Sequence, residues 1–208
     1  MDYKTFLEQT PQNRRGAFGA AAADLGTAPR NVEKDFWICL VLEAIFMEST
    51  RRWPRMAFRG GTSLSKAFNA IGRFSEDIDI AVERADLKIP DTLASLEKLS
   101  PAQRQQRLAI FNAEGEKFIA QTVAPHLEKA LDKLFAPRAA GRPKVRISRA
   151  DKLTIEIEYV STISAPGETQ YIAPTVRLEF SVRSALEPQV YRPITPYVAK
   201  VVPHAEMT

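Results

Sequence analysis

The sequence lacks the cysteines needed for an internal disulfide and the long apolar runs needed to span a membrane. Its 208 residues include a single cysteine, Cys39, so no disulfide can form within the chain. Cys39 lies in an apolar run, which favours a buried and unreactive thiol. No apolar run approaches the roughly 20 residues that a membrane-spanning helix needs, and the first residues do not have the pattern of a signal peptide. The sequence therefore predicts a cytoplasmic protein.

Histidine is also scarce, and the charge is not strongly of one sign. His126 and His204 have no metal-ligand companion at useful spacing, so we expect both to be structural or exposed. A net charge of +4 is compatible with a polyanionic partner without requiring one. One basic cluster suits either a nucleic-acid backbone or solvent. The cluster consists of Arg138, Arg142, Lys144, Arg146 and Arg149.

Hydrophobic periodicity predicts helices in the first part of the chain, followed by a strand and a short helix. A short alanine-rich helix is expected over 20–25. From 32 to 46 apolar residues occur on all sides, which predicts a central buried helix capped by Asn31. A strand over 56–59 and a helix over 64–71, closed by a glycine, come next.

The second half of the chain changes from helical to strand periodicity. A helical region is expected over 91–135, with Pro125 as a break or kink. Strands are expected at 144–148, 153–161 and 175–182, the last two with clean alternation of apolar and polar residues. Together these elements predict an α+β domain whose mixed sheet is covered mainly on one face.

Two carboxylates lie near the start of a further predicted strand over 77–82. Asp77 and Asp79 share one face of this strand, while Ile78 and Ile80 point to the other. Like charges held this close repel each other and favour a divalent cation between them. A solvated acidic strand edge is the alternative.

A glycine turn lies shortly before this pair. Gly60 and Gly61 separate a predicted strand from a predicted helix, and Thr62 or Ser63 is placed to cap that helix. Backbone N–H groups at such a turn can bind phosphate, to which Ser63 can add a hydroxyl and Lys66 a positive charge. The alternative is a tight turn with an ordinary helix cap and a surface lysine.

These motifs together resemble the AbiEii/AbiGii toxin family, whose members are nucleotidyltransferases of the polymerase-β-like superfamily. The resemblance is strongest in FRGGTSLSKA at 58–67 and RFSEDIDI at 73–80. VEKDFW at 32–37 and VRLEFSVRS at 176–184 are similar to the same family and follow the expected order. Many members are toxins of toxin–antitoxin pairs, so the resemblance implies a cognate antitoxin.

The resemblance implies a polymerase-β-like fold and a two-metal mechanism. Asp77 and Asp79 would hold two Mg²⁺ ions, and Gly61 and Ser63 would position the β- and γ-phosphates of an NTP. A nucleoside monophosphate would pass to an acceptor, such as RNA (tRNA ends) or a protein, with release of pyrophosphate. A small-molecule nucleotidyltransferase and a non-catalytic module that binds nucleotide or antitoxin are the alternatives.

Sites of this family usually take a third carboxylate from a neighbouring strand. Glu179 is the candidate, as both a catalytic residue and a metal ligand, because it lies in the family-like segment. Glu156 and Glu158, on the preceding predicted strand, share one face and are its rivals. The alternative for all three is a solvated strand face.

The expected organisation is a single domain over 1–208. We expect a helical part over about 1–54 and a catalytic core over about 55–190. Relatives usually continue into a C-terminal helical region with a lysine and an acidic residue that complete the site. Because this chain stops at Thr208, soon after a proline-rich stretch, we expect that region to be absent.

Overall fold

A five-stranded mixed sheet forms the centre of the protein, in the order β1-β2-β5-β4-β3. The computed structural model describes residues 1–47, 53–71, 76–89, 93–135, 141–164, 173–182, 186 and 189–202. β2 and β5 run parallel, and the other neighbouring strands are antiparallel. The predicted α+β class with a mixed sheet is confirmed. The strands are β1 (Met56–Arg59), β2 (Asp77–Val82), β3 (Lys144–Ile147), β4 (Thr154–Glu158) and β5 (Thr175–Ser181).

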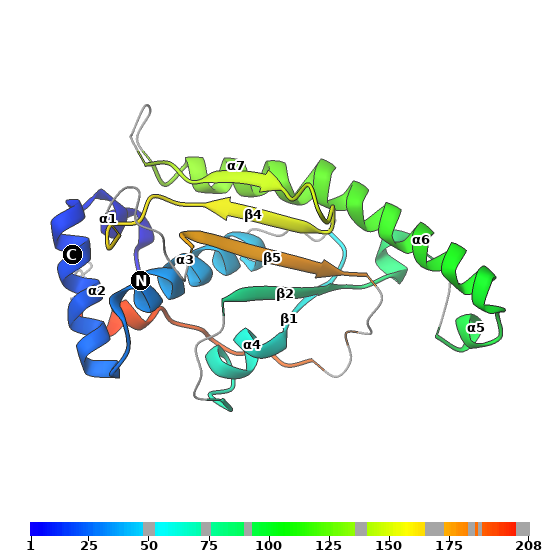
Figure 1. Cartoon of the computed structure of the whole chain (residues 1–208), viewed down its shortest axis with the longest axis horizontal. Coiled ribbons are helices and arrows are strands. Elements are labelled where there is room, and N and C mark those ends of the chain that lie inside the picture. Colours follow the sequence, from blue (N-terminus) through cyan, green and yellow to red (C-terminus); the bar gives the residue numbers. More distant parts are fainter. Residues whose placement is uncertain are drawn as a thin grey trace.

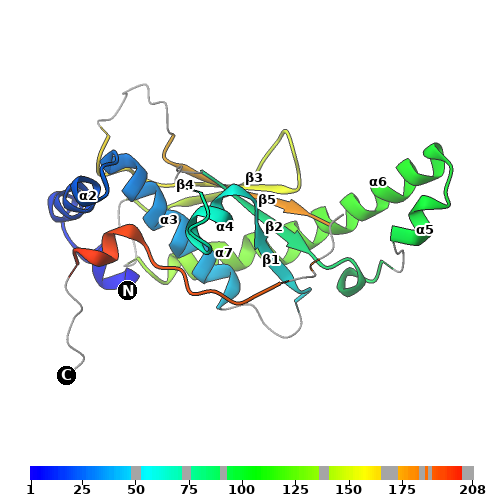
Figure 2. The same ribbon diagram turned by 90° about the horizontal axis from the view of Figure 1, so that it is seen from below.

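Three helices, α3, α6 and α7, lie on one side of the strands (Figure 2). In Figure 1, α1 and α2 lie at one end of the sheet, and α5 with the start of α6 extends beyond the other end. In the part of the chain that the structure describes, no helix has the length and hydrophobicity to cross a membrane. The α-helices are α1 (Tyr3–Glu8), α2 (Pro11–Leu25), α3 (Pro29–Phe46), α4 (Gly60–Lys66), α5 (Leu93–Glu97), α6 (Pro101–Phe118) and α7 (Ala124–Asp132). Shorter helical segments are η1 (Ala85–Leu87), η2 (Ile119–Val123) and η3 (Tyr197–Lys200).

α3 is the central buried helix that the apolar pattern predicts. Phe36 and Trp37 lie in the core, and the Trp37 ring stacks on Tyr159 at 4.9 Å between ring centroids. The prediction that Asn31 caps this helix is wrong, because the helix begins at Pro29. Proline at the first helical position has the φ angle that a helix needs, so the helix starts three residues earlier than expected.

The helical region predicted over 91–135 is divided into several elements. Ser100 accepts a hydrogen bond from the Gln103 N–H while the Gln103 side chain accepts one from the Ser100 N–H. This reciprocal capping box starts α6 and separates it from α5. The expected disturbance at Pro125 is present as the π-helical segment η2, directly before α7. A wider turn here accommodates the missing N–H and the bulk of the proline ring.

α4 ends earlier than the predicted helix over 64–71. Its last residue is Lys66, and Asn69 takes a left-handed conformation with φ of 50°. The Ala70 N–H then donates to the Leu64 carbonyl over 2.8 Å and closes the turn that follows the helix. Asparagine therefore takes the role expected of Gly72, which lies outside the described residues.

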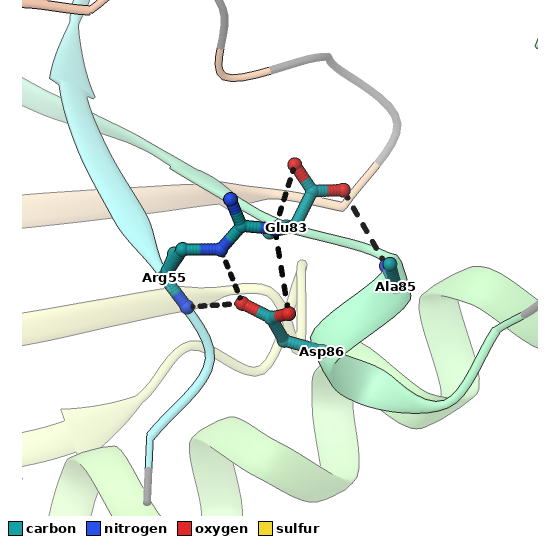
Figure 3. Close-up of polar contacts among 4 residues, drawn as sticks. All are labelled: Arg55, Glu83, Ala85 and Asp86. Atoms are coloured by element: carbon teal, nitrogen blue, oxygen red, sulfur yellow. Dashed lines mark hydrogen bonds and ion pairs between the residues drawn. The ribbon is translucent and has the colours of Figure 1, made fainter. Parts of the chain in front are cut away.

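Ion pairs hold the end of the β1–β2 pair that is farther from the glycine turn. The Arg55 Nε lies 2.9 Å from Asp86 Oδ2, and the Arg55 backbone N–H donates to the same carboxylate (Figure 3). Glu83 lies 3.9 Å from the same guanidinium and accepts a hydrogen bond from the Ala85 N–H. These contacts link the start of β1 to η1, which follows β2.

Candidate active site

The two aspartates of β2 lie on the face of the sheet opposite the buried isoleucines. Ile78 and Ile80 are 0 % and 1 % exposed, whereas Asp77 and Asp79 are half-buried. Successive residues of a strand point to opposite faces, so the two carboxylates are held on one side, roughly 7 Å apart along the strand. The strand therefore presents two carboxylates together on the polar face, as the spacing predicts.

The glycine turn closes directly against Asp79. Arg59, the last residue of β1, is the register partner of Asp79, and Gly60 follows with φ of 72°. A Cβ atom on Gly60 would lie 1.8 Å from Asp79 Oδ2, far inside contact distance. Only glycine fits here, because both the left-handed backbone and the neighbouring carboxylate exclude a side chain.

The electrostatics of the pair suit a cation. Burial raises the pKa of Asp79, the neighbouring Asp77 raises it further, and Arg59 lowers it. A carboxylate whose charge is disfavoured by burial and by a like charge gains most from a bound divalent ion. Carboxylate oxygens are also the ligands that Mg²⁺ prefers. The donor set at Asp77 and Asp79 therefore fits a magnesium ion.

Thr62 and Ser63 are buried, and their hydroxyls hold the turn together. The Thr62 hydroxyl donates to the Asp77 carbonyl, which ties α4 to the start of β2. The Ser63 hydroxyl donates to the Gly60 carbonyl over 3.2 Å. Neither side chain caps α4, whose N-cap residue is Arg59. The expectation that one of them acts as a helix cap is therefore wrong, and both instead fix the turn relative to the aspartates.

Glu179, the candidate for the third carboxylate, lies on the strand next to β2. In the parallel β2–β5 register it lies beside Asp79, whereas Arg177 lies beside Asp77. Glu156 and Glu158 belong to β4, which pairs with β5 and β3 and is one strand farther from the aspartates. The sheet order therefore favours Glu179 as the third carboxylate.

The side chain of Glu179 is engaged with a neighbouring arginine. Arg177 Nη2 lies 3.0 Å from Glu179 Oε1, and both side chains are about half exposed. Among the described residues, no three Asp, Glu, His or Cys side chains are close enough together to hold a metal ion. Glu179 must therefore exchange Arg177 for the ion if the three carboxylates are to act together.

Lys66 does not lie beside the glycine turn as a phosphate ligand would. Its ammonium is 2.6 Å from Asp35 Oδ1 on α3 and 3.6 Å from the centre of the Tyr197 ring. Only 5 % of the Lys66 side chain is exposed, so it is not the surface lysine of the alternative either. This lysine joins the end of α4 to the core.

The other residues considered from the sequence are structural or exposed where the structure describes them. His126 contacts the Ala44 carbonyl at 3.0 Å and packs edge-on against Trp53. Cys39 is 1 % exposed and burial raises its pKa, so its thiol stays protonated as expected. In the basic cluster, Arg142 pairs with an aspartate and Arg146 with a glutamate. Arg138 and His204 lie outside the described residues.

Sequence reasoning missed the burial of three consecutive charges behind this site. Glu33, Lys34 and Asp35 of α3 are between 2 % and 4 % exposed. The signal was present, because three charged residues interrupt a helix that is otherwise apolar on all sides. Charges in such a setting are buried only with partners, and those partners lie far away in the sequence.

Comparison with known proteins agrees with this arrangement of motifs. No curated protein and no solved structure matches the chain. A family model described as nucleotidyl transferase AbiEii toxin, type IV TA system, matches residues 48–208, which include the glycine turn, the paired aspartates and Glu179. The chain therefore belongs to the AbiEii nucleotidyltransferase toxin family of type IV toxin–antitoxin systems.

Proposed function

We propose that the protein is a magnesium-dependent nucleotidyltransferase that uses an NTP to modify an RNA acceptor. The observation that carries this proposal is the register that sets Asp79 beside Glu179, with Asp77 on the same face. Gly60 in contact with Asp79 adds a turn at which a phosphate can approach the carboxylates closely. Family membership supplies the class of reaction, nucleotidyl transfer.

Asp77, Asp79 and Glu179 are the proposed ligands of Mg²⁺. Bound there, Mg²⁺ supplies activation of the acceptor hydroxyl and neutralisation of the triphosphate and of the departing pyrophosphate. The acceptor oxygen forms a bond to the α-phosphorus, and the bond from that phosphorus to pyrophosphate breaks. The three side chains contribute by holding the reacting groups in line, which is the main source of catalysis in phosphoryl transfer.

The glycine turn is proposed to bind the β- and γ-phosphates. Gly60 lets Asp79 lie directly against the turn, and Gly61, in the first turn of α4, offers a backbone N–H group. The Ser63 hydroxyl is available to a phosphate once it leaves the Gly60 carbonyl. Lys66 is not part of this proposal, because its ammonium faces Asp35 in the core.

An RNA acceptor, such as a tRNA end, is supported by basic residues at the far edge of the same sheet. Lys144, Arg149 and Lys152 are exposed on β3 and on the turn that leads to β4. Exposed basic side chains attract a phosphate backbone without selecting a sequence. Membership of a type IV toxin–antitoxin family also implies an antitoxin partner.

Label transfer tests the proposal directly. The protein is incubated with each α-labelled NTP, Mg²⁺ and total cellular RNA, beside Asp77→Asn/Asp79→Asn. The wild type should label RNA, and the double variant should lose at least about 100-fold in rate because the reacting groups are no longer held in place. Asp86→Asn is the matched control, since it removes an exposed carboxylate that pairs with Arg55 away from the site.

The third carboxylate is tested by single substitutions in the same assay. Glu179→Gln should lose activity to a similar extent, whereas Glu156→Gln and Glu158→Gln, one strand farther away, should retain most of it. Activity that survives Glu179→Gln would reject the proposed ligand set. NTP binding without label in RNA or protein would instead favour a nucleotide-binding module without turnover.

A further inference from the structure

The three buried charges of α3 each hold a different segment of the chain. Consecutive helical positions point about 100° apart, so neighbouring side chains face different directions. Glu33 accepts hydrogen bonds from Ser161 and Thr162, which follow β4, at 2.5 to 2.8 Å. Asp35 pairs with Lys66 at the end of α4. The middle residue of the three, Lys34, faces the strands that carry the candidate carboxylates.

Lys34 contacts the segments that enter two neighbouring strands. Its ammonium lies 2.7 Å from Glu76 Oε2, and Glu76 directly precedes Asp77, the first residue of β2. The same ammonium lies 3.4 Å from the carbonyl oxygen of Ala173, just before β5 begins at Thr175. Because β2 and β5 are parallel, both begin at the same end of the sheet. One buried cation therefore bridges the starts of both strands.

We propose that Lys34 is a positioning residue for the three carboxylates of the site. By holding Glu76 and the Ala173 carbonyl together, it fixes where β2 and β5 begin relative to each other. Asp77 is one residue from this bridge, so its carboxylate depends on it most directly. The inference rests on the proposed function, since it assigns Lys34 to the metal site proposed above.

A purely stabilising role would not require these charges. Replacing a buried ion pair by apolar residues of similar size is often neutral or stabilising, because desolvation offsets the attraction between the charges. An ammonium that bridges two segments instead defines a direction and a distance, which apolar contacts do not. The bridge at Lys34 therefore acts mainly by fixing the relative position of the starts of β2 and β5.

Stability and geometry can be separated because the two partners differ in burial. The Lys34 side chain is 5 % exposed and the Glu76 side chain is 35 % exposed. Lys34→Met leaves behind a glutamate that can turn to water, whereas Glu76→Gln leaves behind a buried, unpaired ammonium. Glu76→Gln should therefore lower the melting temperature more than Lys34→Met. If the bridge positions the carboxylates, both variants should nevertheless weaken metal binding.

Mn²⁺ binding to the full chain without nucleotide, measured by electron paramagnetic resonance, tests the proposal. Lys34→Met and Glu76→Gln should each bind Mn²⁺ about 10- to 100-fold more weakly, the usual effect of removing a support behind metal ligands. Lys34→Arg, which keeps the charge and the donors, should recover part of the affinity. Lys34→Met/Glu76→Gln leaves no unpaired charge, so it should fold while still binding Mn²⁺ weakly.

Glu33→Gln is the matched control, because it removes an equally buried charge from the adjacent position of α3. It should lower the melting temperature and leave Mn²⁺ affinity unchanged. Its partners Ser161 and Thr162 follow β4, and neither they nor β4 belong to the proposed metal site. A folded Lys34→Met that binds Mn²⁺ like the wild type would overturn the inference, as would an equal loss in Glu33→Gln. Failure of the proposed function is distinguishable, because the wild type would then show no Mn²⁺ site that Asp77→Asn/Asp79→Asn removes.

Discussion

Replacing Gly60 by alanine tests the contact between the glycine turn and Asp79. The new Cβ would lie 1.8 Å from Asp79 Oδ2 and 2.6 Å from its Cγ. The φ angle of 72° is also one that residues with a side chain rarely adopt. The added methyl group should therefore lower the free energy of unfolding in two ways. It strains the backbone, and it displaces the Asp79 carboxylate.

The two costs can be estimated and then separated by a control. A left-handed residue other than glycine costs about 1–2 kcal/mol. Forcing an atom into a filled space adds about 1–3 kcal/mol, so Gly60→Ala should lower the free energy of unfolding by about 2–5 kcal/mol. Gly26, with φ of 62° and no atom within 4 Å of a built Cβ, has only the backbone cost. Gly26→Ala should therefore cost about 1–2 kcal/mol.

Urea unfolding of both variants gives the stability difference, and Mn²⁺ binding and label transfer give its consequence. Displacing Asp79 by about 1 Å should reduce transfer roughly 100-fold in Gly60→Ala, whereas Gly26→Ala, at the end of α2, should transfer at the wild-type rate. Equal losses of stability in the two variants, with unchanged Mn²⁺ affinity in Gly60→Ala, would refute the close approach of the turn to Asp79.

Further predictions concern packing and pH. Gly115→Ala should lower the free energy of unfolding by about 1–3 kcal/mol, measured in urea, because its Cβ would lie 2.8 Å from Val182 Cγ1. The pKa of Asp79 is higher in the folded protein than in the unfolded chain. Its ionisation therefore destabilises the fold as pH rises from the unfolded pKa through the folded one. Asp79→Asn should therefore raise the melting temperature of the metal-free protein at neutral pH while abolishing transfer. The Asp86 pKa is lowered by hydrogen bonds from Arg55, so its contribution is present above the ordinary pKa and lost as pH falls through the lowered one. Asp86→Asn should then lower the melting temperature at neutral pH, with a difference from wild type that vanishes in acid.

Period-two patterns predicted the strands well, because a strand's faces follow from local spacing alone. The alternation around Ile155 and Ile157 predicted their burial, and both are 0 % exposed. The same rule placed Asp77 and Asp79 on one face. What local spacing does not contain is the order of strands. β5 lies between β2 and β4, although β3 and β4 precede it in the chain. This order adds a geometric reason to prefer Glu179, which the sequence favoured only by its family-like segment.

Helix boundaries were predicted less well, because competing signals lay within a few residues of one another. Asn31 is a good cap by residue type, but Pro29 starts the helix first. The capping box formed by Ser100 and Gln103 is a local signal that divides the region expected to be helical from 91 to 135. A residue type at one position therefore predicts the wrong helix boundary when a nearby residue has a stronger preference for starting a helix.

The inward direction of Lys66 removes one positive charge from the proposed triphosphate site. Sequence spacing suggested a lysine beside the turn, yet its ammonium pairs with Asp35 of α3, a pairing that only tertiary structure sets. Arg59 and Arg177 remain beside the carboxylates, and Arg177 is engaged with Glu179. Among these described residues the carboxylates outnumber the arginines, so at the proposed site a triphosphate would be repelled without metal. If the proposed Mg²⁺ ions bind the carboxylates, nucleotide affinity should depend on them, because they would make the charge near the phosphates positive.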